Sequence, residues 1–121
     1  MSDKIYDFNR ICDDVKQLNT EIRFVGVINE GGRLVAGGMK KDVIPLEGER
    51  EDEILYMELA LRVKMRKEFD NQLGPVNFAM SSRVSALAIS FPIGDDTLYV
   101  VSEPSIDYSK LVDTIFKIIR K

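Results

Sequence analysis

The sequence predicts an α+β domain with the element order α-β-β-α-β-β-β-α and a five-stranded antiparallel sheet flanked by helices. Three observations favour this class. Three segments carry apolar residues at helical spacing, five short segments are rich in β-branched or aromatic residues, and most strands are joined by short turns. At 121 residues the chain is expected to form one domain over 1–121.

The first element is an amphipathic helix over about residues 3–20, with Ser2 or Asp3 as its cap. Its apolar residues recur at steps of three and four and form a narrow stripe: Ile5, Phe8, Ile11, Cys12, Val15 and Leu18. A catalytic thiol needs a base, and the chain has no histidine. We therefore interpret Cys12 as a small core residue.

A β-hairpin follows, with strands over Ile22–Asn29 and Arg33–Gly37 and a turn at Asn29-Glu30-Gly31-Gly32. Gly26 inside the first strand indicates a bulge or a close backbone approach. The next segment, Gly38–Glu53, is irregular and carries charges of both signs. We interpret it as a mobile or partner-facing loop. Its candidate partner-binding residues are Lys40, Lys41, Asp42, Glu47 and Arg50.

The second helix runs from about Glu51 to Gln72, begins with acidic residues that suit its dipole, and ends at Gly74-Pro75. It has two apolar stripes, about 100° apart on an ideal wheel. One stripe contains Ile54, Met57, Leu61 and Met65, and the other contains Leu55, Leu59 and Val63. A helix that is apolar on more than one side is usually buried on more than one side. We expect a second subunit to cover one stripe, and the wheel does not decide which.

The last third predicts a three-stranded meander followed by a helix. The strands are Val76–Met80, Val84–Phe91 and Thr97–Ser102, connected by Ser81-Ser82-Arg83 and by a break at 92–96. The final helix spans about Asp107 to Arg120, and one of its faces is apolar: Tyr108, Leu111, Val112, Ile115, Ile118 and Ile119.

Composition excludes several kinds of site. Without histidine there is no imidazole base or ligand, and with one cysteine there is no intramolecular disulfide. The glycine-rich run from Gly31 to Lys41 is not a P-loop, because Met39 separates Gly38 from Lys40 and no Ser or Thr follows the lysines. The carboxylates at 47–53 lack the spacing of a calcium loop. We expect no catalytic residue, cofactor or metal.

The net charge of −3 does not favour nucleic acid as a partner. The basic residues Arg62, Lys64, Arg66 and Lys67 leave three interpretations open: a nucleic-acid surface, a solvated helix end, or a partner for the acidic residues 51–53 of a second, antiparallel copy. The N-terminus is polar, and the most apolar stretches, Ile54–Val63 and Val84–Ile93, are too short to cross a bilayer. We expect a cytoplasmic protein without membrane insertion.

The order of elements resembles the roadblock/dynein-light-chain domain, a relative of longin and profilin-like folds. The resemblance rests on the hairpin FVGVINEGGRLVAGG, the long helix after it, the meander VNFAM, VSALAISF and TLYVVS, and the closing helix. The stretch LYMELALRVKMRKEFDNQLGPVNF is also similar to an uncharacterised group of small archaeal proteins. The charged segment 38–53 is long for the roadblock family, and no GTPase-contact residue can be transferred.

The resemblance implies a non-enzymatic homodimer, since roadblock domains pair through the central helix and the adjoining third strand. Family members commonly bind small Ras-like GTPases or act as adaptors in larger complexes. The implied interface comprises Ile54, Leu55, Met57, Leu59, Leu61, Val63, Met65, Val76 and Phe78.

A second function class remains open, because related sandwiches of the PAS type hold small ligands between sheet and helix. Its candidate lining residues are Arg23, Asn77, Ser85 and Tyr99, which are also compatible with ordinary strand positions. An enzyme is the third alternative, and no nucleophile–base pair is visible for it.

Overall fold

The computed structural model describes residues 5–41, 43–44 and 48–121. The predicted order of elements is confirmed, with two short helical turns added after the long helix. The elements are α1 (Phe8–Lys16), β1 (Ile22–Ile28), β2 (Leu34–Met39), α2 (Glu49–Arg66), the 3-10 turn η1 (Lys67–Phe69), α3 (Asp70–Leu73), β3 (Ala79–Ser82), β4 (Leu87–Ile93), β5 (Asp96–Ser102) and α4 (Tyr108–Ile119).

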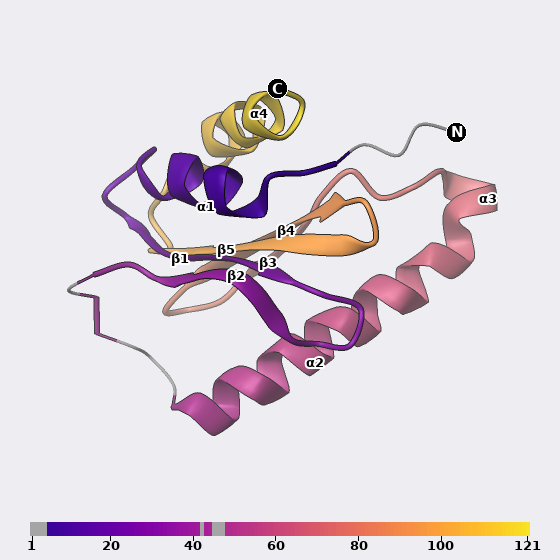
Figure 1. Cartoon of the computed structure of the whole chain (residues 1–121), viewed down its shortest axis with the longest axis horizontal. Helices are drawn as coiled ribbons and strands as arrows, with labels where there is room; N and C mark the ends of the chain where they lie inside the picture. Colours follow the sequence, from indigo (N-terminus) through magenta and orange to yellow (C-terminus); the bar gives the residue numbers. More distant parts are fainter. Residues whose placement is uncertain (1–4, 42, 45–47) are drawn as a thin grey trace.

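The strands form one antiparallel sheet in the order β2-β1-β5-β4-β3. The β1–β5 pair at its centre joins the first hairpin to the last strand of the meander. Helices α1 and α4 lie on one face of the sheet and α2 lies on the other (Figure 1). The predicted α+β fold, with a five-stranded antiparallel sheet flanked by helices, is therefore confirmed. The edges of the sheet are β2 and β3.

The main hydrophobic core lies between the sheet and helices α1 and α4. Side chains alternate along a strand, so every second residue of β4 and β5 points into this core. An aromatic cluster closes one end: the Phe91 and Phe116 rings stand perpendicular at 5.4 Å, and Phe78 covers both at 6.2 and 6.1 Å. Cys12 is buried in the same core, as predicted, and burial raises the pKa of its thiol to about 11.

Helix α1 is shorter than the predicted 3–20. It begins at Phe8 because the Asp7 carboxylate accepts a hydrogen bond from the Arg10 amide at 3.1 Å and caps the helix. It ends at Lys16. Ile5 precedes the cap and is 93% exposed, so its predicted place on the apolar stripe is wrong. The predicted caps Ser2 and Asp3 lie outside the described residues.

Strand β3 spans Ala79–Ser82, so the strand expected over Val76–Met80 is present but begins three residues later than predicted. The residues after Pro75 leave the sheet because Phe78 turns toward the aromatic cluster of the α4 face. Ser81 and Ser82, predicted as a connection, belong to β3. The connection is instead the turn at 83–86, where the Arg83 amide donates to the Ala86 carbonyl oxygen at 2.9 Å.

Strand β4 starts at Leu87 rather than Val84 and continues through Pro92 and Ile93, which were expected in a break. Pro92 is tolerated because it lies beyond Ser90, the last β4 residue that pairs with β3. The hairpin turn between β4 and β5 consists of Gly94 and Asp95, and Gly94 has a φ of +67°.

Two glycines, Gly26 and Gly37, lie opposite each other where β1 and β2 pair. A Cβ atom on Gly26 would lie 2.6 Å from the Leu34 Cδ1 atom and 2.8 Å from the Phe24 ring, so the close approach at Gly26 is to side chains rather than to the predicted backbone. Gly37 has a φ of +78°, and a Cβ atom there would lie 2.1 Å from the Val25 carbonyl oxygen. A larger side chain at Gly37 would therefore require the hairpin backbone to move, whereas one at Gly26 would displace the Leu34 and Phe24 side chains.

Helix α2 begins at Glu49 and continues through η1 and α3 as far as Leu73. Gly74, with a φ of +82°, and Pro75 end this segment as predicted. Because β2 extends to Met39 and α2 begins before Glu51, the segment between them is shorter than the predicted Gly38–Glu53. It spans 40–48, of which 42 and 45–47 lie outside the described residues.

Candidate functional site

The two apolar stripes of α2 differ in their surroundings, since one faces the sheet and the other faces solvent. Leu55, Leu59 and Val63, here called the inner stripe, pack against Phe24, Ile28 and Tyr99 on the sheet. The outer stripe is solvent-exposed: Ile54, Met57, Leu61 and Met65 have exposed fractions between 60% and 63%. Among the α2 side chains that the structure describes, Leu59 alone is fully buried. The structure thus resolves what the helical wheel left open, and the outer stripe is the one that a partner can reach.

The candidate interface residues therefore fall into three groups. The outer stripe is at the surface, and the inner stripe is covered by the chain's own sheet. The other two candidates lie elsewhere: Val76 is half-buried beside the end of α2, and Phe78 packs on the α4 side.

Sequence reasoning missed three further exposed apolar residues, two beyond the end of α2 and one on the edge strand of the sheet. Phe69 and Leu73 lie four and eight residues beyond Met65 and are 58% and 82% exposed, so their spacing already continues the outer stripe. Met80 on β3 is 40% exposed and, because it pairs with Ile89, lies on the α1/α4 side of the sheet edge. The sequence placed Met80 at the end of a predicted strand, and no pattern around it indicated that its side chain is exposed.

Positive charge gathers beside this stripe, toward the edge strand β3. Arg62, Arg66 and Arg83, with Ser81 and Ser90, line a groove of about 170 Å³ between α2 and the β3–β4 strands. Glu58 offsets part of this charge through a salt bridge to Arg62 at 3.6 Å. Burial, and then the charge of Arg62, lower the pKa of Arg66. The groove is thus an incompletely neutralised basic surface.

The predicted partner-binding residues are only partly brought together. Lys40 is held by the fold, since its amide donates to the Arg23 carbonyl oxygen at 2.9 Å and its Nζ atom to the Asn19 carbonyl oxygen at 3.1 Å. Lys41 is exposed just after β2, and Arg50 is exposed in the first turn of α2. Asp42 and Glu47 lie outside the residues that the structure describes.

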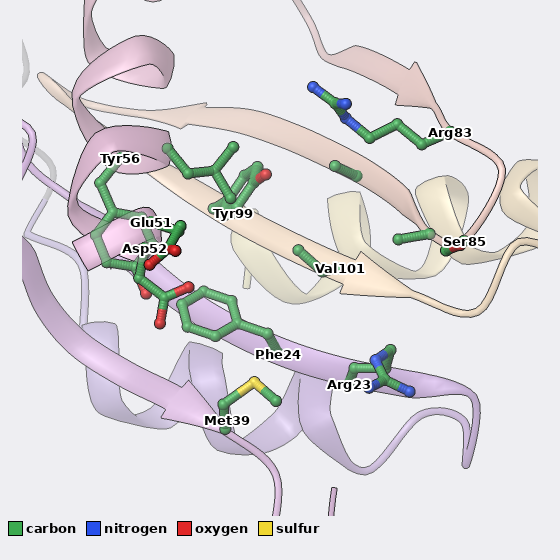
Figure 2. Close-up of a pocket in the computed structure, with 13 residues that line it drawn as sticks. Arg23, Phe24, Met39, Glu51, Asp52, Tyr56, Arg83, Ser85, Tyr99 and Val101 are labelled. Carbon is green, nitrogen blue, oxygen red and sulfur yellow. The ribbon is translucent and has the colours of Figure 1, made fainter. Parts of the chain in front are cut away.

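A cavity of about 300 Å³ lies between the first half of α2 and the sheet. Three of the four residues predicted for a ligand cavity, Arg23, Ser85 and Tyr99, line it together, and Asn77 is not among its walls. Figure 2 shows the aromatic side chains of Phe24, Tyr56 and Tyr99 on one side of the cavity, with Ser85 and the two arginines on the other. The sequence could not indicate that Glu51 and Asp52 share these walls, because that depends on where α2 crosses the sheet.

The Arg23 guanidinium is fixed at the rim of this cavity. It donates to a Glu103 carboxylate oxygen at 2.7 Å and to the Ile44 carbonyl oxygen. The side chain of Arg23 is only 16% exposed, so this ion pair is more strongly held than a typical surface pair. Arg23 therefore shapes the rim, and its charge is largely offset.

Within the residues described, no group of three or more Cys, Asp or Glu side chains is placed to hold a metal ion. Nor does any helix in the described part of the chain combine the length and apolar character needed to span a bilayer. The distinctive features of the α2 face are instead an exposed apolar stripe, a basic groove and a cavity.

The fold has close counterparts among solved structures. A Roadblock/LC7 domain from Streptomyces avermitilis superposes with a TM-score of 0.71 at 10% identity, over 95% of this chain and 93% of that one. The gliding protein MglB from Thermus thermophilus gives 0.73 at 14% identity, over 97% and 89%. An MglB structure described as a tetrameric arrangement gives 0.64 at 12% identity, over 96% and 93%.

These likenesses confirm the roadblock-like fold that the order of elements indicated, and at such identities they show the fold alone. The similarity to small archaeal proteins stays a prediction. None of the curated proteins matches the sequence. A family model matches residues 2–121, nearly the whole chain, and the chain therefore belongs to the family of unknown function DUF6659.

Proposed function

We propose that this protein is a homodimeric interaction module, without catalytic activity of its own, that acts as a scaffold or regulator for a small Ras-like GTPase. The exposed outer stripe of α2 carries the proposal. Its four large apolar side chains form an exposed strip along α2, and Phe69 on η1 and Leu73 on α3 add exposed apolar side chains beyond its end. Soluble monomers rarely expose a contiguous apolar patch without a partner.

The charges along α2 favour a second copy of this chain as the partner. The helix starts with the acidic residues Glu51, Asp52 and Glu53 and ends in the basic stretch 62–67. Two copies packed antiparallel around a two-fold axis place the acidic start of each helix beside the basic stretch 62–67 of the other. Parallel packing would bring like charges together.

The edge of the sheet next to this surface supports the same arrangement. β3 pairs with β4 on one side only, so its outer hydrogen-bonding groups remain available. Pairing two β3 strands would continue the sheet from one subunit into the next.

The test of dimerisation is light scattering at low micromolar protein, comparing wild type with Leu61→Glu. The wild type is expected near twice 13.8 kDa, and Leu61→Glu near 13.8 kDa. Val84→Glu is the matched control, because Val84 is also exposed but lies on the β3–β4 turn outside the stripe. A wild type that stays at 13.8 kDa, or a control that dissociates as fully as Leu61→Glu, contradicts the proposal.

The GTPase part needs a separate experiment. Purified protein is titrated against small Ras-like GTPases of the source organism, each loaded with GDP or a GTP analogue. Binding is expected to depend on the bound nucleotide and to weaken in the double variant Lys41→Glu/Arg50→Glu, which reverses two exposed charges next to the 40–48 segment. No binding to any GTPase in either nucleotide state would restrict the function to dimerisation.

A further inference from the structure

The cavity under the first half of α2 lies between the helix and its own sheet, away from the outer stripe, and shares only Glu51 and Asp52 with the dimer surface proposed above. Its volume of about 300 Å³ is at the lower end of the range for small-molecule sites. Its floor is mainly apolar and aromatic and comes from the helix and from three strands: Phe24, Leu55, Tyr56, Ala88, Tyr99 and Val101. Such a floor with charged groups at its rim is the usual composition of a ligand pocket.

The space exists because the sheet presents small residues below the helix. On β4, Ala88 points to the cavity, whereas its neighbours Leu87 and Ile89 point to the opposite face and are buried there. Ala86 and Ser85, just before β4, are also short. Leucine-sized side chains at these positions would fill the cavity, as they fill the core on the α1/α4 face.

Charges of opposite sign stand at opposite ends of the floor. Glu51 and Asp52 line the cavity from α2, and Arg83 lines it from the turn between β3 and β4 (Figure 2). Within the part of the chain that the structure describes, none of these three side chains forms a salt bridge, whereas Arg23 at the rim is neutralised by Glu103. Within the described residues, the cavity therefore has one negative end and one positive end whose charges are not paired by a salt bridge.

We propose that this cavity binds a small organic zwitterion whose ammonium and carboxylate groups stand at opposite ends of an apolar spacer, as in an ω-amino acid. The ammonium group would lie at Glu51 and Asp52, beside the aromatic rings of Phe24 and Tyr56. The carboxylate would meet the Arg83 guanidinium, which can donate two parallel hydrogen bonds. The spacer would cover Val101 and Ala88.

The first experiment compares three probes by calorimetric titration of the full chain: 6-aminohexanoate, hexylamine and hexanoate. They share a six-carbon chain and differ in which end is charged. We expect 6-aminohexanoate to bind about tenfold more tightly than either single-ended probe, since each of these lacks one charge-assisted contact. Equal affinity for all three, or no binding of 6-aminohexanoate below about 10 mM, overturns the proposal.

Variants locate the two ends of the site. In Arg83→Gln, affinity for 6-aminohexanoate is expected to fall about tenfold, while affinity for hexylamine stays unchanged. Asp52→Asn is expected to weaken hexylamine and 6-aminohexanoate but not hexanoate. Arg33→Gln is the matched control, because it removes an equal charge from the exposed β1–β2 turn and should bind as wild type. Affinities that are unchanged in Arg83→Gln and Asp52→Asn contradict the proposed orientation.

Ala88→Leu tests the cavity itself, since it fills the floor and keeps every charge. Loss of all probe binding is expected, with the fold checked by thermal unfolding without ligand. A folded Ala88→Leu protein that still binds 6-aminohexanoate refutes the site. If this variant does not fold, the wild-type probe series and Arg83→Gln still decide the question. Light scattering on the same samples reports dimerisation separately, so a change of oligomeric state in Asp52→Asn can be distinguished from a loss of probe binding.

Discussion

On the α1/α4 face, strand β4 places Leu87, Ile89 and Phe91, all buried beneath two helices. On the α2 face, the same strand places Ala88 and Ser90, above which lie a cavity and a basic groove. Strand β5 differs in the same way, with Leu98 and Val100 in the main core, while Tyr99 belongs to a small cluster with Leu59.

The two faces of the sheet therefore differ in what they contribute to stability and to recognition. Two helices with one apolar face each cover the α1/α4 face, and the resulting core is dense. A single helix covers the opposite face, is apolar on both sides, and buries only Leu59 fully among its described side chains. The groups left available for a partner or ligand therefore gather on the α2 face.

The difference in packing between the two faces can be tested most directly by truncating one large side chain on each face. Phe91→Ala removes a fully buried ring that contacts both Phe78 and Phe116, and we expect it to lower the free energy of unfolding by about 3–5 kcal/mol. Leu59→Ala on the α2 face should cost about 2 kcal/mol, because its surroundings are less tightly packed. Urea denaturation of both variants at equal protein concentration measures the difference.

Equal costs at the two positions would mean that the α2 face is packed as tightly as the main core. Leu34→Ala serves as a control for truncation of a partly exposed side chain, since Leu34 is 39% exposed on the edge strand β2. Leu34→Ala should lower the free energy of unfolding by much less than Phe91→Ala or Leu59→Ala does.

Patterns that repeat along the chain predicted most of the fold. Helical spacing identified α1, α2 and α4, and β-branched runs identified each strand, because both patterns follow from which side chains a sheet or helix must bury. Boundaries were less accurate where a long-range contact decides them. Phe78 reads as a strand residue locally, yet it leaves the sheet to pack on Phe91 and Phe116.

The candidate site was predictable only in part. The two stripes of α2 were visible in the sequence, but which one faces the sheet depends on the rotation of the helix, which the packing of Leu59 on Tyr99 fixes. Arg23, Ser85 and Tyr99 were candidates for a ligand site. Their convergence with Glu51 and Arg83 depends on the crossing of α2 over the sheet, and no local pattern records it.

A second prediction concerns how the stability of the α1/α4 core depends on pH. Burial in the α1/α4 core raises the pKa of Cys12 from 9.0 to about 11. Between these values the unfolded chain loses the thiol proton and the folded chain keeps it, so stability falls as pH rises. We expect a loss of about 1 kcal/mol between pH 8 and pH 10. Urea denaturation of wild type and Cys12→Ala at both pH values isolates this loss, which the variant should lack. An equal loss in both proteins would assign it to other groups.

The smallest expected effect concerns the α2 face, where Asp96 lies at the start of β5. Burial, then the nearby carboxylates of Glu30 and Asp95, raise the pKa of Asp96 above its usual value of 3.8, against the opposing charge of Lys67. The ionised carboxylate is therefore less favourable in the folded chain than in the unfolded chain. Asp96→Asn should raise the free energy of unfolding at pH 7 by about 0.3 kcal/mol, because the site is partly solvated.

The sign of this effect can be checked by lowering the pH. Below its usual pKa, Asp96 is protonated in both the folded and the unfolded chain, so the advantage of Asp96→Asn should disappear near pH 3. Asp113→Asn on the exposed side of α4 is the charge-matched control, far from Glu30 and Asp95. Thermal unfolding at pH 7 and pH 3 compares the three proteins. An Asp96→Asn variant that is less stable than wild type at pH 7 would show that the carboxylate stabilises the β4–β5 hairpin, and that charge repulsion at this end of the α2 face is already relieved.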